Sequence, residues 1–337
     1  MPTIALPVLE VNRDLESGDN ALLFTEGLPD INNIYENEEK PAVCRGHCNC
    51  VNSAVYSPDG MCIASVSDDN TISIWDSRSY EQLYSVSGHY ERVNSVDFHP
   101  NGRRLVTASM DETIKIWGSE LAGPILVLQG HTDSVNSAVF SHDGNYIASS
   151  SLDGTVKIWM SDTGKLCNTL HLGCYNVNQV AYGPAGGSMA TASAGGSVKV
   201  WEISNAAATL RHDLTGCPGN VFAVCYHPGG DYLASAGSDA QVRIWQVESG
   251  ELLRVLKGHE GSVYSVKYSP DGSRLVTASN DKTVKVWDSS TGELLETLLG
   301  HAGNVNSAVF SPDGRRIISA SDDNVIRIWR CNGGISY

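Results

Sequence analysis

Histidine, a hydroxyl residue and aspartate recur together along this chain of 337 residues, and these are the three residue types of a hydrolytic triad. A hydroxyl residue stands ten positions before each tryptophan: Ser65, Thr107, Ser149, Thr191, Ser235, Thr277 and Ser319. An aspartate stands six positions before six of the seven tryptophans: Asp69, Asp111, Asp153, Asp239, Asp281 and Asp323. Five histidines follow a glycine in the same register: His47, His89, His131, His259 and His301. A hydrolytic role would require up to seven active sites, so we interpret these residues as structural.

The tryptophans themselves set the period of the chain. They are Trp75, Trp117, Trp159, Trp201, Trp245, Trp287 and Trp329, with spacings of 42, 42, 42, 44, 42 and 42 residues. A period this regular indicates an array of structural repeats.

Each repeat has the pattern of four short strands. In residues 130–159 the segments VNSAVF, YIASSS and TVKIW are β-branched and alternating, and the turn signals HDG and LDG separate them. A fourth strand precedes each glycine-histidine pair, for example LYSVS before Gly88 and LLRVL before Gly258. One small sheet of this kind cannot bury both of its faces, so seven are expected to pack face to face in a ring.

The chain resembles the WD-repeat β-propeller family over residues 46–329. The resemblance rests on the five Gly-His pairs, the seven tryptophans in register with them, and Trp-Asp at 75–76 and 287–288. It implies an all-β fold, a seven-bladed β-propeller of four-stranded antiparallel blades. The expected repeats are approximately 46–87, 88–129, 130–171, 172–214, 215–257, 258–299 and 300–331.

The resemblance also implies that histidine, hydroxyl, aspartate and tryptophan form a hydrogen-bonded tetrad in each blade. The indole N–H is only a donor and a buried carboxylate must be satisfied, so the hydroxyl and the imidazole complete the chain between them. Each such bond stabilises by about 1 kcal/mol net, whereas a buried Val, Ile or Leu contributes about 1.5 to 3 kcal/mol. Apolar packing is therefore expected to hold the ring together, and the tetrads to fix strand register.

The ends of the repeat region predict how the ring closes. After Trp329 only RCNGGISY remains, which is too short for a full fourth strand, so residues 40–45 are expected to complete the last blade. We therefore predict a propeller domain over 40–337 and a mobile or weakly packed extension over 1–39. That extension carries nine acids and one arginine, and its apolar cluster Ala21-Leu22-Leu23-Phe24 is alternatively a docking motif for a partner.

Two adjacent blades depart from the pattern. In the fourth, Gly173 takes the histidine position and Gly195 the aspartate position; in the fifth, Cys217 replaces the histidine. One interpretation is sequence drift that the fold tolerates, because Trp201 and Trp245 are still present to pack. The other is a mobile or partner-specific sector, which requires lower protection from hydrogen exchange over 173–245.

The narrow face of the propeller is where the resemblance implies peptide or protein binding. One residue per blade, directly after the first-strand valine, is expected there: Asn52, Asn94, Asn136, Asn178, Phe222, Tyr264 and Asn306. The asparagines either offer amide groups to a peptide or are a default of the family's consensus. The adjacent aromatics Phe222 and Tyr264 are the first choice for an interface anchor; alternatively both rings lie flat against neighbouring blades. The same face is expected to include Arg92, Met110, Leu152 and Asn220.

Composition excludes several classes of partner. The net charge of -15 and pI near 5.0 argue against binding to a nucleic-acid backbone or an anionic membrane, since both need a basic face. The N-terminus lacks a signal-peptide pattern, and no run approaches the roughly 20 apolar residues of a membrane span. Nine scattered cysteines fit a reducing compartment, so we expect the cytoplasm or nucleus. The Cys44-to-Cys50 segment matches no standard zinc spacing, and no metal, cofactor or small-molecule ligand is expected.

These observations together predict a non-catalytic scaffold or adaptor that binds other proteins in a multiprotein complex. The alternative is a substrate receptor of a cullin-RING ubiquitin ligase, because Trp75-Asp76-Ser77-Arg78 resembles the docking box of such receptors, although Val66 departs from the usual small residue before it. An enzyme is not expected. The chain has no phosphate-cradling glycine loop, Gly-x-Ser-x-Gly elbow or closed set of metal ligands.

Overall fold

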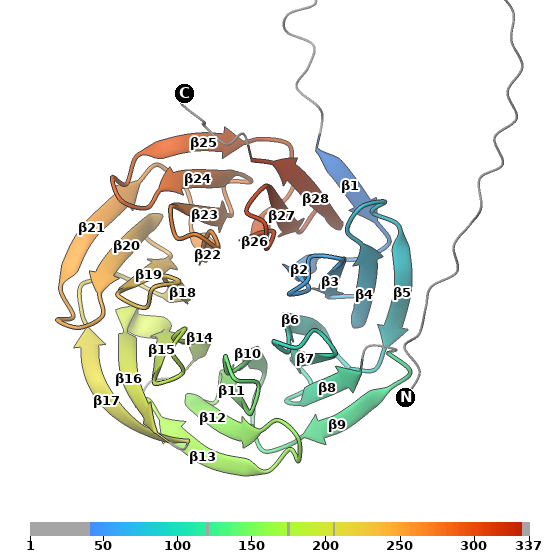
Figure 1. Cartoon of the computed structure of the whole chain (residues 1–337), viewed down its shortest axis with the longest axis horizontal. Coiled ribbons are helices and arrows are strands. Elements are labelled where there is room, and N and C mark those ends of the chain that lie inside the picture. The colour runs from blue at the N-terminus through green and yellow to red at the C-terminus, as the bar shows by residue number, and fades with distance from the viewer. Residues whose placement is uncertain (1–40, 119–120, 174–175, 205, 332–337) are drawn as a thin grey trace, which may run out of the picture. The chain divides into compact units, whose positions relative to one another are not determined.

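The computed structural model describes residues 41–118, 121–173, 176–204 and 206–331, all within the compact unit Pro41–Tyr337. Seven four-stranded antiparallel sheets stand around a central opening as the blades of a propeller (Figure 1). The expected all-β, seven-bladed architecture is confirmed. Among the described residues the only helix is the 3-10 turn η2 (Ala194–Gly196), and none is long and apolar enough to cross a membrane.

The first six blades take their strands in chain order, from the central opening outward. Blade 1 contains β2 (Val51–Tyr56), β3 (Cys62–Ser67), β4 (Thr71–Asp76) and β5 (Gln82–Ser87). Blade 2 contains β6 (Val93–Phe98), β7 (Arg104–Ser109), β8 (Ile114–Gly118) and β9 (Pro124–Leu128). Blade 3 contains β10 (Val135–Phe140), β11 (Tyr146–Ser151), β12 (Thr155–Met160) and β13 (Leu166–His171).

The next three blades repeat this order. Blade 4 contains β14 (Val177–Tyr182), β15 (Ser188–Ser193), β16 (Val198–Ser204) and β17 (Ala207–Leu214). Blade 5 contains β18 (Val221–Tyr226), β19 (Tyr232–Gly237), β20 (Gln241–Gln246) and β21 (Leu252–Lys257). Blade 6 contains β22 (Val263–Tyr268), β23 (Arg274–Ser279), β24 (Val284–Asp288) and β25 (Leu294–Leu298).

Blade 7 combines strands from both ends of the repeat region. Its first three strands are β26 (Val305–Phe310), β27 (Arg316–Ser321) and β28 (Val325–Arg330), and its outer strand is β1 (Ala42–Arg45). β1 runs antiparallel to β28, with Ala42 opposite Ile328 and Arg45 opposite Val325. Residues 1–40, including the cluster Ala21 to Phe24, lie outside the described residues.

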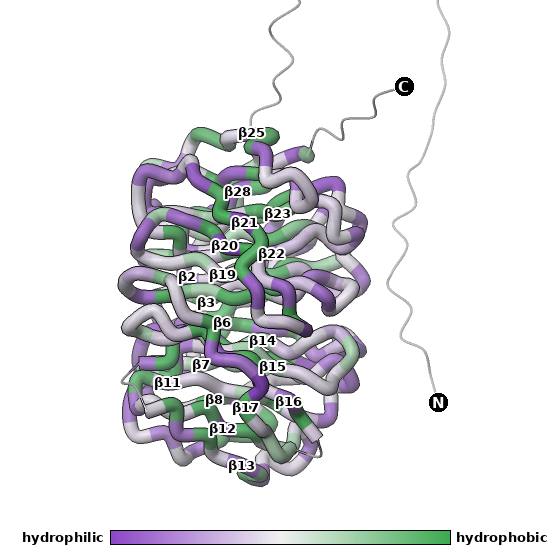
Figure 2. Tube along the Cα trace, turned by 90° about the vertical axis from the view of Figure 1, so that its left-hand side faces the viewer, coloured by the Kyte–Doolittle hydropathy of each residue, from purple (hydrophilic) through white to green (hydrophobic). Residues whose placement is uncertain are grey.

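The core lies between the blades. Each of the seven clusters of buried apolar side chains draws on two neighbouring sheets; one of them joins Val106 and Ile116 of blade 2 to Val135 and Trp159 of blade 3. Figure 2 shows this division, with apolar strands inside and polar turns at both ends. Because each blade buries several such side chains, apolar packing is the main force that closes the ring.

A β-bulge interrupts the first strand of every blade. The register between first and second strands shifts after the first valine, for example between Val51 and Ser53 or between Val221 and Ala223. A bulge re-aims the extra side chain, and the extra residues are the seven that the sequence predicted for the narrow face. We call the end of the propeller with the Gly-His loops the narrow face, and the end with the turns between first and second strands the opposite face.

Candidate functional site

Buried hydrogen-bonded networks support the narrow face. In blade 1, the Trp75 Nε1–H donates to Ser65 Oγ at 2.8 Å, and Ser65 Oγ lies 2.8 Å from His47 Nε2. His47 Nδ1 lies 3.0 Å from Asp69 Oδ2. The same network joins Trp117, Thr107, His89 and Asp111; Trp159, Ser149, His131 and Asp153; Trp287, Thr277, His259 and Asp281; and Trp329, Ser319, His301 and Asp323.

The protonation of these networks follows from burial. Burial lowers the pKa of His131, more than the neighbouring Asp153 raises it, so the imidazole is neutral. Its Nδ1–H donates to Asp153, and its Nε2 accepts the Ser149 hydroxyl proton. Burial alone would raise the pKa of Asp153, but hydrogen bonds from Thr155 and His131 lower it to about 2.

The hydroxyl groups of the networks are closed to substrate. Ser65, Thr107, Ser149, Thr277 and Ser319 are each 0% exposed, and each accepts a hydrogen bond from an indole. A nucleophile must reach the atom that it attacks. The His-Ser/Thr-Asp grouping therefore has the residue types of a hydrolytic triad, but its hydroxyl is not accessible to a substrate.

Blade 5 replaces the imidazole with a guanidinium. The Arg243 guanidinium donates to Asp239 Oδ2 at 2.6 Å, while Trp245 Nε1–H still donates to Ser235 Oγ at 2.8 Å. Cys217, in the histidine position, lies 4.0 Å from Ser235 Oγ. The role of Arg243 was not predicted from the sequence, although an aspartate without its histidine needs another donor, and a cation stands two residues before Trp245.

Blade 4 keeps only the indole bond. Trp201 Nε1–H donates to Thr191 Oγ1 at 3.2 Å. Gly173 and Gly195 have no side chains to extend the network, and both adopt positive φ, 71° and 79°. The turn that elsewhere carries the aspartate is here the short helix η2.

The asparagines at the bulges bind the neighbouring blade. Each donates its side-chain amide to the carbonyl of the next blade's first valine: Asn52 to Val93 at 2.8 Å, Asn94 to Val135 at 2.8 Å, Asn136 to Val177 at 3.0 Å, Asn178 to Val221 at 2.6 Å and Asn306 to Val51 at 3.0 Å. Asn52 and Asn306 also donate to Asp68 and Asp322. These bonds hold neighbouring blades together and leave mainly the amide oxygens for a partner. This bridging role was not predicted from the sequence.

The two aromatic residues that break this series contact each other. The rings of Phe222 in blade 5 and Tyr264 in blade 6 lie 5.3 Å apart, centroid to centroid, at 67°. Both side chains are half-buried. They therefore form an edge-to-face pair across the interface between blades 5 and 6, at the position where asparagine bridges neighbouring blades elsewhere.

The remaining predicted residues of this face differ in exposure. Arg92 and Asn220 are exposed, Met110 is 44% exposed, and Leu152 is half-buried. Asn220 Oδ1 accepts a hydrogen bond from the Gly195 N–H at 3.3 Å, which joins blade 5 to blade 4. Tyr90, which is 88% exposed and directly follows His89, was not among the predicted residues.

Arg78 lies on the opposite face. Asp76 Oδ1 accepts the backbone N–H groups of Arg78 and Ser79, each at 2.8 Å, so the turn is fixed while the Arg78 side chain is exposed.

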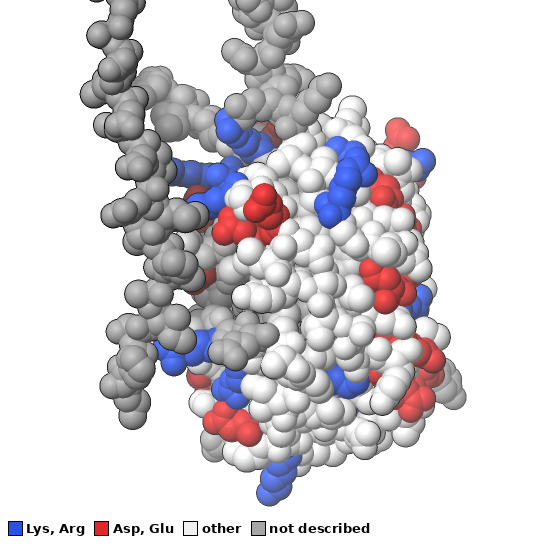
Figure 3. Space-filling view, turned by 90° about the vertical axis from the view of Figure 1, so that its right-hand side faces the viewer, with Lys and Arg blue, Asp and Glu red and all other residues white. Residues whose placement is uncertain are grey.

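The side of the ring shown in Figure 3 has acidic and basic groups interspersed on a largely uncharged surface. Within the described part of the chain, no group of three or more His, Cys, Asp or Glu is arranged to hold a metal ion.

Comparison with known proteins agrees with this geometry. The WD40 family model (WD domain, G-beta repeat) matches residues 38–76, 80–118, 122–160, 164–202, 208–246, 250–288 and 292–330. Each match takes the outer strand of one blade and three strands of the next, so 80–118 covers β5 to β8. No curated protein matches the chain significantly. The seven matches cover most of the chain, which therefore belongs to the WD40 repeat family.

Proposed function

We propose that this propeller is a non-catalytic scaffold that binds a protein partner through its narrow face. WD40 propellers commonly serve as protein-interaction scaffolds and are generally non-catalytic. We further propose a multiprotein complex in the cytoplasm or nucleus as its setting. The rigid ring would present partners at fixed geometry, and the buried networks would hold that surface without taking part in chemistry.

The observation that carries this proposal is the Phe222–Tyr264 pair. Five of seven bulges hold an asparagine that bonds the next blade, whereas these two neighbouring bulges place half-buried aromatic rings at the same face. Rigid aromatic side chains supply large contact area at low entropic cost, and they are enriched at interfaces.

A second apolar group lies across the opening. Tyr90 and Met110 belong to blade 2, and Figure 1 shows that blade 2 faces blades 5 and 6 across the centre. A segment of a partner lying over the opening would contact both groups. Arg92, exposed beside Tyr90, would add charge complementarity at the rim.

The test is affinity capture from native lysate, followed by mass spectrometry, with wild type and a Phe222→Ala, Tyr264→Ala variant of confirmed fold. The matched control is Tyr84→Ala, because Tyr84 is 54% exposed but lies on the outer strand β5. Partners that are lost only with the double substitution support the proposal. Partners that the double substitution leaves unchanged would refute the narrow face as the binding surface.

The alternative role as a ubiquitin-ligase substrate receptor has one supporting observation. The exposed Arg78 side chain follows a turn that Asp76 fixes, so it is accessible to an adaptor. The role predicts that Arg78→Ala abolishes recovery of the ligase adaptor, with folding unchanged. Recovery of the adaptor at the wild-type level would exclude it.

A further inference from the structure

The innermost strand of each blade lies at the central opening (Figure 1). These seven strands are β2, β6, β10, β14, β18, β22 and β26, and each has six residues. Among all of them only two residues are charged, Asp97 in β6 and Lys267 in β22. The other five blades form the same sheet without a charge in this strand, so the fold itself requires neither residue.

Both charged residues occupy the fifth position of their strands. The fourth position is buried in every blade: Ala54, Val96, Ala138, Val180, Val224, Val266 and Ala308. The fifth position is half-buried in every blade: Val55, Asp97, Val139, Ala181, Cys225, Lys267 and Val309. Because these residues lie on the strands nearest the centre of the ring, we infer that their exposed surface faces the opening.

Asp97 is held against the wall of the opening. Its Oδ2 accepts the backbone N–H of Phe140, in the innermost strand of blade 3, at 2.9 Å. Burial raises the pKa of Asp97 to about 6, although the Phe140 N–H and the positive charge of Lys267 lower it. The carboxylate is therefore mainly ionised at pH 7, and it interacts electrostatically with Lys267.

Lys267 is the less satisfied of the two residues. Its ammonium group has three donors but forms no hydrogen bond or ion pair with any residue that the structure describes. Figure 1 shows β22 and β6 on opposite sides of the opening, so the two charges interact without contact. Two opposite charges that are held apart inside a protein are costly, and a ligand that bridges them offsets this cost.

We propose that the central opening binds a small zwitterion, a free amino acid, between Lys267 and Asp97. The carboxylate of the ligand accepts hydrogen bonds from Lys267, and its ammonium group donates to Asp97. The ligand and the pair of charges are each neutral overall, so binding needs no counter-ion. Val55, Val139 and Val309 add apolar surface beside the charges, which favours an apolar side chain. This site goes beyond the proposed scaffold function, and it departs from our expectation that the protein has no small-molecule ligand.

The test is isothermal titration calorimetry of the full chain with L-valine, with isovalerate and isobutylamine as its analogues of single charge, and with the valine dipeptide. The test variants are Lys267→Met and Asp97→Asn, of which the second keeps an acceptor for the Phe140 N–H. The matched control is Lys257→Met, because Lys257 is exposed on the outer strand β21. Thermal unfolding confirms that each variant is folded.

We expect the wild type to bind each analogue of single charge about tenfold or more weakly than L-valine, and both test variants to lose L-valine affinity by a similar factor. Lys257→Met should bind L-valine as the wild type does. The proposal is wrong if the wild type does not bind L-valine, if either analogue binds as tightly, or if Lys257→Met weakens binding as much as Lys267→Met does. Tighter binding of the valine dipeptide would also overturn it, because the occupant would then be a peptide.

Discussion

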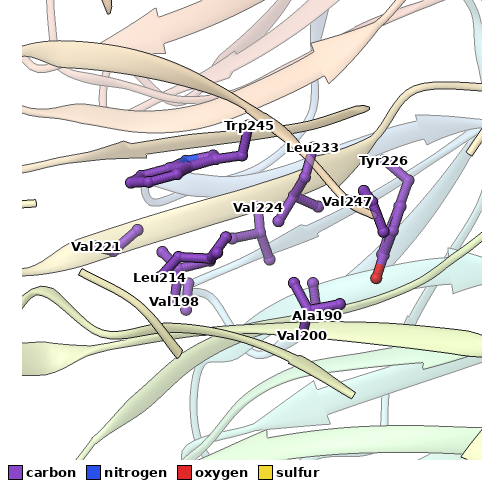
Figure 4. Close-up of a cluster of buried hydrophobic side chains, with 11 residues drawn as sticks. Ala190, Val198, Val200, Leu214, Val221, Val224, Tyr226, Leu233, Trp245 and Val247 are labelled. Carbon is purple, nitrogen blue, oxygen red and sulfur yellow. The ribbon is translucent and has the colours of Figure 1, made fainter. Parts of the chain in front are cut away.

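Five blades of this propeller contain a complete histidine network and two neighbouring blades do not, yet all seven have the same four-stranded sheet. The difference isolates what the networks contribute. Figure 4 shows the packing between the two divergent blades: Trp245, Leu233 and Val224 of blade 5 face Val198, Val200 and Leu214 of blade 4. A complete histidine network is therefore not required to form a blade, because apolar packing and the remaining indole bond are sufficient in blade 4.

The two divergent blades are also unlike each other. Blade 5 is compensated, because Arg243 satisfies Asp239 where a histidine is missing. At Gly237, which replaces a serine found in the other blades, an added Cβ would lie 2.2 Å from the Asn220 carbonyl oxygen, so only glycine fits. Blade 4 lost both the histidine and the aspartate, and the hydroxyl of its Ser193 is buried without a hydrogen-bond partner among the described residues.

Acidification is expected to have the largest effect, and to act on the five complete blades. Burial lowers the pKa of each network histidine below its usual 6.5. Just below pH 6.5 the unfolded chain therefore binds protons at these histidines that the folded chain does not bind. The free energy of unfolding should therefore be greatest above pH 6.5 and fall below it, by about 1.4 kcal/mol per pH unit for each histidine that stays neutral. Denaturant titrations at pH 7, 6 and 5 measure this slope.

The aspartates of the same networks cause a further loss of stability at lower pH. Asp153 and Asp281, whose pKa values are about 2, stabilise the fold above pH 4 and lose that contribution as the pH falls toward 2. Hydrogen exchange, corrected for its intrinsic pH dependence, should show that protection falls first in blades 1, 2, 3, 6 and 7. Unchanged stability between pH 7 and pH 5 would contradict the assignment of neutral, buried histidines.

Removing one imidazole should lower the free energy of unfolding by less than acidification does. The loss should nevertheless differ between the complete and the divergent blades. His131→Ala leaves the buried Ser149 hydroxyl and the Asp153 carboxylate without their partner, and we expect a loss of about 3 kcal/mol in the free energy of unfolding. The matched change in blade 5, Cys217→Ala, removes only a weak contact and should cost about 1 kcal/mol or less. Similar losses in the two variants would mean that the networks do not distinguish the blades.

Arg243→Met tests whether blade 5 is compensated. It leaves the partly buried Asp239 without its guanidinium, and we expect a loss of about 2 kcal/mol. Lys157→Met, at the same position of blade 3, should cost about 1 kcal/mol or less, because that lysine donates to Thr169 at 3.2 Å and Asp153 has its own histidine. Adding Cys217→His to Arg243→Met should recover stability; a double variant as unstable as the single one would show that Arg243 does not stand in for the imidazole.

The sequence predicted the fold because its signals are local and repeat with one period: the tryptophans, the hydroxyl residues and the turn aspartates. Properties that depend on contacts between blades escaped it. The asparagine bridge from Asn52 to Val93 spans two repeats, and the pairing of Phe222 with Tyr264 does the same.

Hydrogen exchange over 173–245 remains the test of whether the divergent sector is mobile, and lower protection there than in the other blades is expected mainly in blade 4. A single hydrogen bond, from Trp201 to Thr191, is what remains of its network.

Thr191→Val, which keeps the shape and removes this acceptor, should therefore have the smallest effect, about 1 kcal/mol. Thr277→Val in blade 6 removes the acceptor of Trp287 and the partner of His259 together, and it should cost about 2 to 3 kcal/mol. Thermal unfolding of the two variants compares one bond with a connected network of the same residue types. If the two substitutions lower stability equally, the connections between the hydrogen bonds add nothing to it. The missing histidines of blades 4 and 5 would then have no consequence for stability.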